Sequence, residues 1–361
     1  MSISEAAAQI EWNECWLDRR PVPPELAAEV RHLLGIVPDW IGRVADVPWL
    51  PRAFAALNHP LFAHMPPHLW RLIAFVVSQD QSCRHCYGLT RSMLKMLGFE
   101  DQWIEALERD VQLANLAEPD RLALDFARRV SKANPRPRST DRARLAAAGF
   151  TDAAVAEIAY AASAAVVSNR IATLLALPSE RMVLWADRPI TRLLRPVTSR
   201  IFRVRPAKAE PLPQPNDGPC AEVVAALAGA PAARVLRRMI DEAMASPVLP
   251  RRTKLLMTGV IGRALDCAHA EQEVRAGLLA DGFDAGEVAD VLGNLASPRL
   301  DARETLLVPY ARETVRYRNT DIQERTRLLA ERMSRAEVLE AVGVASLANG
   351  VCRLSVLLDA C

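Results

Sequence analysis

The chain has little of what marks a β-rich or disordered protein. Of its 361 residues only 15 are glycine and 5% are aromatic, whereas half are apolar. Alanine, leucine and arginine are abundant instead, a composition that suits packed α-helices. We find no convincing strand pattern of alternating apolar and polar residues. The sequence therefore predicts an all-α protein, long enough for two domains that each bury a core.

The sequence also lacks an excess of one charge, a secretion signal and a long hydrophobic run. The net charge of +2 gives no electrostatic reason to expect a nucleic-acid partner. The N-terminal residues have no basic start followed by an apolar core. The most apolar run, 158–167, is shorter than the roughly 20 residues that span a bilayer. We therefore expect a cytoplasmic protein with no membrane span, whose seven cysteines are mostly free thiols.

One motif of reactive side chains follows a nearly all-apolar helical pattern. Cys83 and Cys86 stand three residues apart, with Arg84 and His85 between them as potential positive charges. We expect Ser82 to cap a helix that begins here. Both sulfurs then lie on one helix face, where free N–H groups and the helix dipole favour thiolate over thiol. Two such thiols in a chain without a secretion signal predict a redox-active pair.

The chain repeats itself at an offset of 184 residues. Cys83 corresponds to Cys267 (267 − 83 = 184), and the same offset maps Arg91 to Arg275 and Gly98-Phe99 to Gly282-Phe283. After a one-residue gap, Glu157 corresponds to Glu340 and Arg170 to Arg353. Matches in order over so long a stretch predict an internal duplication. The second copy has Ala270 in place of Cys86, so we expect it to have lost one thiol.

These patterns divide the chain into four parts. They are a helical extension over 1–47, a domain with the Cys-x-x-Cys motif over 48–186, a basic and proline-rich linker over 187–219, and a degenerate second domain over 220–361. Seven cations lie in the linker, from Arg188 to Lys208. We favour a solvated connector over an amphipathic helix on an anionic surface, because Pro196 would break such a helix.

The motif and its surroundings resemble a known family. A buried apolar helix, then Cys83-Arg84-His85-Cys86 and a helix ending in Gly98-Phe99, look like the alkylhydroperoxidase AhpD / carboxymuconolactone decarboxylase family, the AhpD branch in particular. The resemblance covers about residues 50–185 and, more weakly, about 230–360. It implies a helical homo-oligomer that reduces a hydroperoxide or a disulfide substrate without a cofactor.

The resemblance also implies roles for the motif residues. Cys86 would attack the peroxide and become a sulfenic acid, Cys83 would resolve it as a disulfide, and His85 would belong to the proton relay. A dithiol reductant such as lipoamide, or a thioredoxin-like protein, would then re-reduce the pair.

Two positions depart from the family pattern. The family's relay glutamate, twelve residues before the first cysteine, is Arg71 here, and its relay histidine, four residues after the second, is Thr90. An arginine cannot accept the proton that a thiol loses, although it can stabilise the thiolate. The candidates for the missing base are His85, Asp80 and Glu157.

Alternatives stay open for individual residues and for the whole protein. Arg71 is either an anion-binding group or an ion-pair partner of Asp80, and His85 is either a relay residue or a surface histidine. A decarboxylase-like lyase would need no thiols, but a histidine base and arginines for a carboxylated substrate. A non-enzymatic binding protein would need none of these groups.

The remaining cysteines and histidines suggest no chemistry of their own. We expect no metal site, because zinc usually takes four ligands and no second Cys/His pair exists in the first copy. Cys267 and His269 are interpreted as a remnant kept for packing, and Cys352 as a buried thiol. We expect the cluster of His59, His64 and His68 at the surface.

Overall fold

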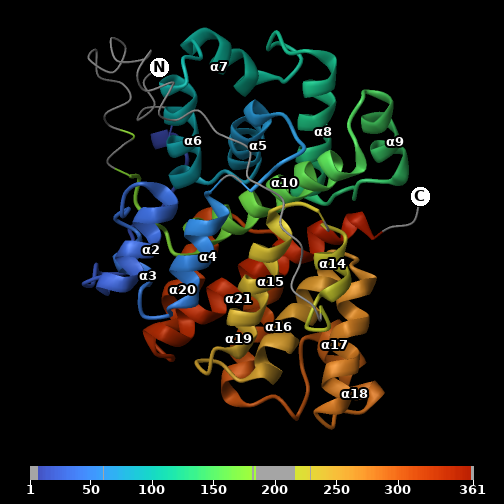
Figure 1. Ribbon diagram of the computed structural model, residues 1–361. Helices are drawn as coiled ribbons and strands as arrows, with labels where there is room; N and C mark the ends of the chain where they lie inside the picture. The colour runs from blue at the N-terminus through green and yellow to red at the C-terminus, as the bar shows by residue number, and fades with distance from the viewer. Residues whose placement is uncertain (1–6, 60, 181–182, 184–215, 228, 359–361) are drawn as a thin grey trace.

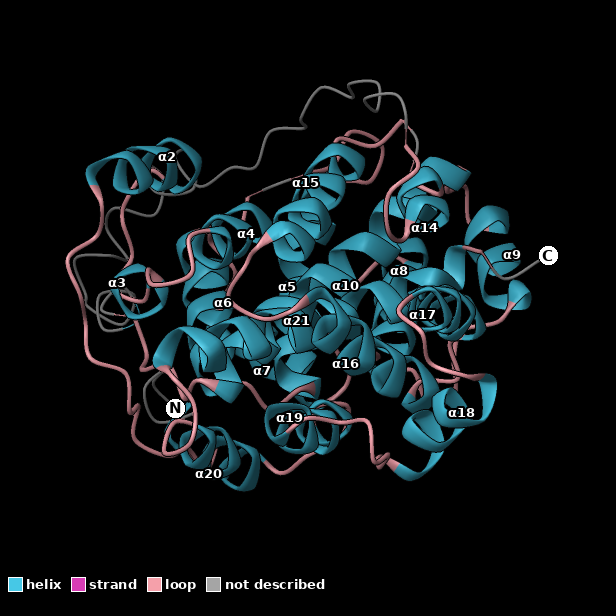
Figure 2. Cartoon of the chain, turned by 90° about the horizontal axis from the view of Figure 1, so that it is seen from below, coloured by secondary structure: helices cyan, strands magenta, loops and turns pink. Residues whose placement is uncertain are grey.

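The computed structural model describes residues 7–59, 61–180, 183, 216–227 and 229–358. All regular structure in these ranges is helical (Figure 2), so the predicted all-α class is confirmed for them. The predicted basic segment 188–208 lies outside the described residues.

The first half of the chain forms a set of helices in the upper part of Figure 1. They are α2 (Pro24–Leu34), α3 (Ile41–Val44), α4 (Trp49–Leu57), α5 (Pro67–Asp80), α6 (Arg84–Met96), α7 (Asp101–Arg109), α8 (Glu118–Lys132), α9 (Ser139–Ala147) and α10 (Asp152–Leu174). Proline opens α2 and α5, where its missing N–H costs no hydrogen bond. Thr151 caps α10 by accepting the N–H of Ala154.

The second half forms a similar set in the lower part of Figure 1. Its helices are α14 (Ala221–Ala225), α15 (Ala232–Ala245), α16 (Arg251–Ala264), α17 (Ala268–Ala280), α18 (Ala285–Asn294), α19 (Ala302–Glu313), α20 (Asn319–Leu329) and α21 (Arg335–Leu354), followed by a 3₁₀ turn, η1 (Ser355–Leu357). Capping boxes start α18, α19 and α21.

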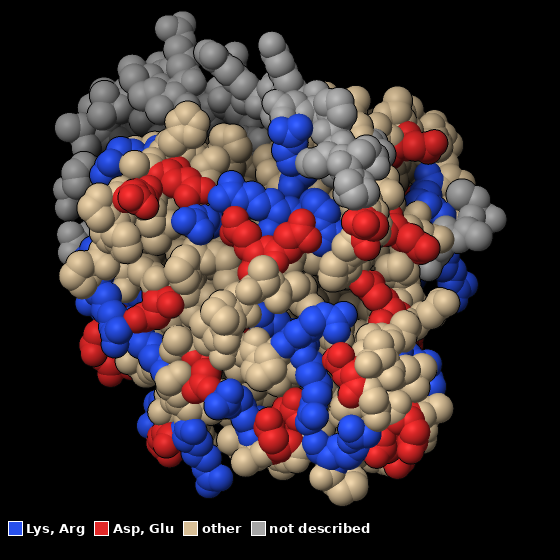
Figure 3. Space-filling model, turned by 60° about the horizontal axis from the view of Figure 1, so that its bottom comes forward, with Lys and Arg blue, Asp and Glu red and all other residues tan. Residues whose placement is uncertain are grey.

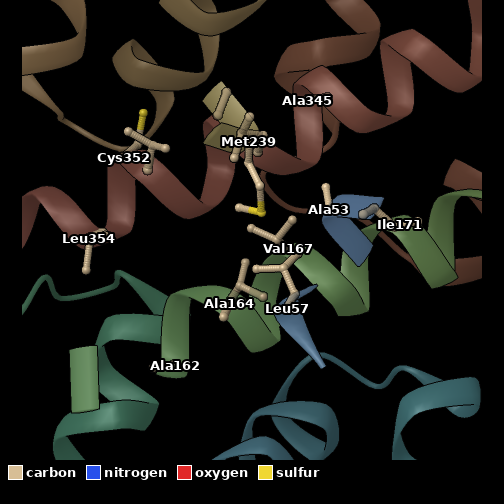
Figure 4. Packing of buried hydrophobic residues seen from close by; sticks show 14 of the residues in the cluster. Ala53, Leu57, Ala162, Ala164, Val167, Ile171, Met239, Ala345, Cys352 and Leu354 are labelled. Atoms are coloured by element: carbon tan, nitrogen blue, oxygen red, sulfur yellow. The ribbon is translucent and has the colours of Figure 1, made fainter. Parts of the chain in front are cut away.

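Helices α10 and α21 pack against each other at the centre of the molecule (Figures 1 and 4). Both are buried over most of their length, and α5 and α8 cover α10 while α16 covers α21. Gly350 allows their close approach, because a Cβ there would lie 2.3 Å from Cγ2 of Val167. Among the described helices, the segment Arg335–Leu357 has the length and composition of a membrane span, but its apolar window is wholly buried in the protein.

The helix boundaries of the two halves follow the offset found in the sequence. Helix α5 begins at Pro67 and α16 at Arg251 (251 − 67 = 184). Helix α10 begins at Asp152 and α21 at Arg335 (335 − 152 = 183). Helices α6, α7 and α8 also begin 184 residues before α17, α18 and α19, whereas α9 begins 180 residues before α20 (319 − 139 = 180).

Two buried arginines tie the halves together reciprocally. Arg170 on α10 donates to the carbonyl oxygens of Thr314 and Val315, at 3.0 and 2.9 Å. Arg353 on α21 donates to the carbonyl oxygen of Ser131, at 2.8 Å. Each arginine therefore satisfies carbonyl groups at the end of a helix in the opposite half. On the outside, the face drawn in Figure 3 carries interspersed charges of both signs.

Candidate active site

The turn between α5 and α6 places the Cys-x-x-Cys motif. Ser82 has a left-handed backbone (φ +50°), and the N–H of Cys83 bonds to the carbonyl of Ser78 at 3.1 Å. Cys83 is then the last non-helical residue, and its sulfur accepts the N–H of Cys86 at 3.4 Å. The prediction that Ser82 caps this helix is wrong, because the tight turn moves the cap position to Cys83.

The two thiols form a hydrogen-bonded, electrostatically unequal pair. Both are free; Cys83 is fully buried and Cys86 is 8% exposed. Burial raises the pKa of Cys83, but hydrogen bonds from the Cys86 thiol, backbone N–H groups and Thr173 outweigh it, so this pKa is lowered. The pKa of Cys86 is raised well above its usual value by burial and by its bond and charge interaction with Cys83. The pair therefore holds its first thiolate on Cys83.

A cavity of about 270 Å³ reaches one of the two sulfurs. Cys86 lines it and Cys83 does not. Its walls are mainly apolar side chains from helices of the first half and the loops between them, among them Leu34, Trp40, Phe54, Leu57, Trp70 and Met93. A substrate in this cavity would therefore meet the sulfur of Cys86 first.

His85 lines the same cavity as a buried, neutral base. Its side chain is 1% exposed, so the surface alternative is wrong. Nδ1 lies 2.6 Å from the carbonyl oxygen of Pro178, which can only accept, so the ring proton is assigned to Nδ1. Nε2 then carries a lone pair and has no hydrogen-bond partner in the described part of the chain. Burial lowers the pKa of His85, so the positive charge expected beside the sulfurs is not supplied by this residue.

Arg71 also lines the cavity, as a cation with no carboxylate partner in the ranges that the structure describes. Its buried Nε has no hydrogen-bond partner among the described residues, and burial lowers its pKa to about 10. The alternative of an ion pair with Asp80 is wrong, because Asp80 instead pairs with Arg128 at 2.6 Å and Lys132 at 3.2 Å. Arg71 therefore keeps its charge at neutral pH and offers it to the cavity.

Of the remaining residues that the sequence analysis considered, Thr90 lines the cavity, whereas Glu157 and Asp80 lie outside it. Thr90 lines the cavity, and its hydroxyl donates to the carbonyl oxygen of Cys86 at 2.8 Å. Glu157 is buried and accepts the backbone N–H groups of residues 63–65 at 2.6 to 2.7 Å. Of the three residues considered for the missing base, His85 lines the cavity, whereas Glu157 and Asp80 do not.

The cavity contains two titratable residues that the sequence analysis did not assign to it. His59, expected at the surface, is half-buried, with Nδ1 3.0 Å from the carbonyl oxygen of Leu33. Glu180 supplies a carboxyl group whose pKa is raised by burial and by Asp39. No motif or spacing marks either residue, since both reach the cavity only through tertiary packing. In the described residues, no three His, Cys, Asp or Glu side chains are grouped to hold a metal ion.

Comparisons with known proteins find solved structures that are similar to part of this chain. No family model matches the chain, and no curated protein does. An uncharacterized peroxidase-related protein from Silicibacter sp. TM1040 is similar with a TM-score of 0.39 and 26% identity, over 44% of this chain and 86% of that protein. The alkylhydroperoxidase AhpD core of a peroxidase-related protein from Ralstonia eutropha JMP134 is similar with a TM-score of 0.42 and 23% identity, over 48% and 98%. The chain thus has structural similarity to AhpD-core, peroxidase-related proteins over about half its length.

Proposed function

We propose that the protein is a thiol-dependent peroxidase in which Cys83 and Cys86 alternate between dithiol and disulfide. One observation carries this proposal: two hydrogen-bonded free thiols open α6, and one of them lines an apolar cavity together with a neutral histidine. Neighbouring thiols of unequal pKa are suited to attack and resolution in thiol–disulfide chemistry.

The reaction balances in two steps. His85 Nε2 takes the proton of the Cys86 thiol, whose sulfur attacks the terminal oxygen of the hydroperoxide. The O–O bond breaks, and the alkoxide takes that proton and leaves as an alcohol. The Cys83 thiolate then attacks the Cys86 sulfenic sulfur, the S–O bond breaks, and the hydroxide leaves as water with a solvent proton. The two sulfurs supply the two electrons that reduce the peroxide.

The cavity favours an organic hydroperoxide with an acidic group. Its apolar walls and volume of about 270 Å³ suit an alkyl or aryl body rather than hydrogen peroxide alone. The charge of Arg71, which has no carboxylate partner in the described part of the chain, matches a carboxylate on the substrate, to which a guanidinium can donate two hydrogen bonds. A cytoplasmic dithiol, small like lipoamide or part of a thioredoxin-like protein, completes the cycle in this proposal.

The proposal includes an internal duplication and a homo-oligomer. The nearly equal helix spacing of the two halves and the reciprocal contacts of Arg170 and Arg353 support the duplication. A pseudo-symmetric chain of this kind is a natural unit for a symmetric assembly.

Peroxide consumption by the full-length, dithiol-reduced protein tests this function. Cys86→Ser should abolish turnover, and Cys83→Ser should stop after one equivalent with a sulfenic acid on Cys86. Cys15→Ser, which changes a half-buried thiol outside the cavity, is the matched control and should keep its activity. Unchanged turnover in Cys86→Ser would overturn the proposal.

A lyase acting on a carboxylated substrate is a second candidate. The unprotonated Nε2 of His85 and the cation of Arg71 line one cavity, which is the combination that such a reaction needs. A lyase would keep its activity when Cys83 and Cys86 are both changed to serine and would lose it in Arg71→Ala. The peroxidase, in contrast, would lose its activity in the double serine variant.

A further inference from the structure

A second cluster of cysteines lies in the C-terminal half, away from the cavity described above. Cys220, Cys267 and Cys352 line a small cavity of about 60 Å³ together with His269, Glu273 and Ser355. All three cysteines are free. The spacing of these cysteines in the sequence indicates no motif, because helix packing alone brings them together.

Cys267 and Cys352 lie next to each other in this cavity. Cys267 precedes α17, as Cys83 precedes α6, while Cys352 lies on the last turns of α21. Ser355 joins the two residues: its hydroxyl lies 3.1 Å from the sulfur of Cys267 and donates to the carbonyl oxygen of Cys352 at 2.9 Å. In Figure 4 the sulfur of Cys352 points to the side of α21 opposite α10. Helices α10 and α21 are related by an offset of 183 residues, so Cys352 corresponds to Asn169 (352 − 169 = 183). The second half therefore has a thiol at the position where the first half has an amide that lines the first cavity.

A cation from the other half completes this cluster. Arg136 donates to the hydroxyl of Ser355 at 3.0 Å and to the carbonyl oxygen of Asp266 at 2.7 Å. The pKa of Cys267 is lowered to about 6: the interaction with the Cys352 thiol is the largest cause, and Ser355, a backbone N–H and the charge of Arg136 add to it against burial. The pKa of Cys352 is raised well above its usual value by the same interaction and by burial. The two sulfurs therefore hold one thiolate and one thiol near neutral pH.

We propose that Cys267 and Cys352 form a second reversible dithiol–disulfide couple, one that reacts with hydrogen peroxide. From Ala270, the sequence predicts that the second half has lost one of its two thiols. In this proposal Cys267 has a partner thiol all the same, which comes from α21 instead of α17. The volume of about 60 Å³ has room for a few water-sized molecules and excludes a large organic hydroperoxide.

The chemistry needs only the peroxide and an external dithiol. The Cys267 thiolate attacks one oxygen of hydrogen peroxide, the O–O bond breaks, and the hydroxide takes a solvent proton and leaves as water. The Cys352 thiol attacks the resulting sulfenic sulfur, the S–O bond breaks, and the hydroxyl leaves as water with the Cys352 proton. A dithiol returns both cysteines to thiols by exchange and becomes a disulfide itself.

The test uses full-length protein carrying Cys83→Ser and Cys86→Ser, so that its outcome does not depend on the first site. The reduced protein is treated with one equivalent of hydrogen peroxide, alkylated and digested without reductant. We expect a peptide pair joined through Cys267 and Cys352 that disappears on treatment with a dithiol. The same linkage should appear in otherwise unchanged protein, which guards against a folding defect in the variant.

Two further variants separate this couple from an accidental contact. Cys352→Ala should leave a sulfenic acid on Cys267 that a dimedone-type reagent traps, and should slow thiol loss about tenfold. Cys220→Ser should leave the linkage unchanged, although Cys220 lines the same cavity. Alkylation of both Cys267 and Cys352 after peroxide treatment, or an equal yield of linkage to Cys220, would overturn the proposal.

Discussion

At the N-terminus of α6, an imidazole and two thiols have separate tasks in the proposed reaction. Cys86 is the sulfur that lines the cavity, but its pKa is raised, so it needs a base to attack. Cys83 has the lowered pKa, but it is sealed from the cavity and suited to resolving. We assign the base role to His85, because burial lowers its pKa and its Nε2 has no hydrogen-bond partner among the described residues.

The pH dependence of peroxide reduction tests this role of His85. The pKa of His85 is lowered below its ordinary value of 6.5, and the neutral form is the base. The rate of sulfenic acid formation on Cys86 should therefore be independent of pH just above 6.5 and fall only at lower pH, as His85 is protonated. In His85→Gln the rate should drop about 100-fold and lose this acidic limb.

His68→Gln is the matched control, since His68 is an exposed histidine paired with Asp120. It should leave the pH profile unchanged. An acidic limb with a midpoint above pH 6.5, or one that persists in His85→Gln, would contradict the assignment.

Substrate preference tests the role of Arg71. In Arg71→Ala, KM for a carboxylated organic hydroperoxide should rise about tenfold or more, because a charge-assisted contact is lost. KM for the uncharged ester of the same hydroperoxide should stay nearly constant, and Arg71→Lys should restore part of the difference. Equal changes for acid and ester would show that Arg71 acts only on the shape of the cavity.

At the scale of helices, much of the fold follows from local signals. The sequence predicts a helix over 66–79 where α5 spans Pro67–Asp80, because a proline in the first turn and an apolar run are visible without tertiary context. It also predicts a helix over 152–177, and α10 begins at the predicted residue, Asp152, and ends at Leu174. The N-cap of α6 is predicted at Ser82 but lies at Cys83. The turn at Ser82 depends on the end of α5, because the N–H of Cys83 bonds to the carbonyl of Ser78.

The sites were only partly predictable for the same physical reason. Cys83, Cys86 and His85 are neighbours in sequence, so their motif identifies them. The walls of the first cavity come from several helices and from the loop after α10 that carries Glu180, and nothing local marks them. The proximity of Cys267 and Cys352 depends on the packing of α21 beside the start of α17.

The crossing of α10 and α21 gives a stability prediction. Gly350→Ala should lower the free energy of unfolding by about 1–3 kcal/mol, because its Cβ would lie 2.3 Å from Val167 in a packed interface. Gly293→Ala in α18 is the matched control, as its Cβ would meet nothing within 4 Å. That variant should be neutral or more stable by up to about 1 kcal/mol. Urea unfolding of both variants measures the difference; equal effects would contradict the close packing.

At the scale of the molecule, buried polar groups hold the halves in register. Glu340 on α21 accepts the indole N–H of Trp49 at 2.7 Å and pairs with Lys254 at 2.9 Å, both charged groups being fully buried. The Lys254 ammonium also donates to the carbonyl oxygens of Ala243 and Ser246. One carboxylate thus joins α4 of the first half to α16 and α21 of the second.

A double-mutant cycle tests this connection. Glu340→Gln should destabilise the protein by about 3–5 kcal/mol, because it leaves the Lys254 charge buried without its partner. The double variant with Lys254→Met should lose less than the sum of the single changes. Arg263→Gln breaks a more exposed pair with Glu271 and should have a much smaller effect. Strict additivity of Glu340→Gln and Lys254→Met in chemical unfolding would contradict the pairing.

The central claim is that Cys83 and Cys86 join and separate as a disulfide. The most direct measurement is peptide mapping of reduced, full-length protein after one equivalent of an organic hydroperoxide, with released alcohol measured in the same sample. The account predicts a Cys83–Cys86 linkage, one alcohol per linkage formed, and complete reversal by a dithiol. Recovery of both cysteines as alkylated thiols, or a sulfenic acid on Cys86 that never forms the linkage, would contradict it.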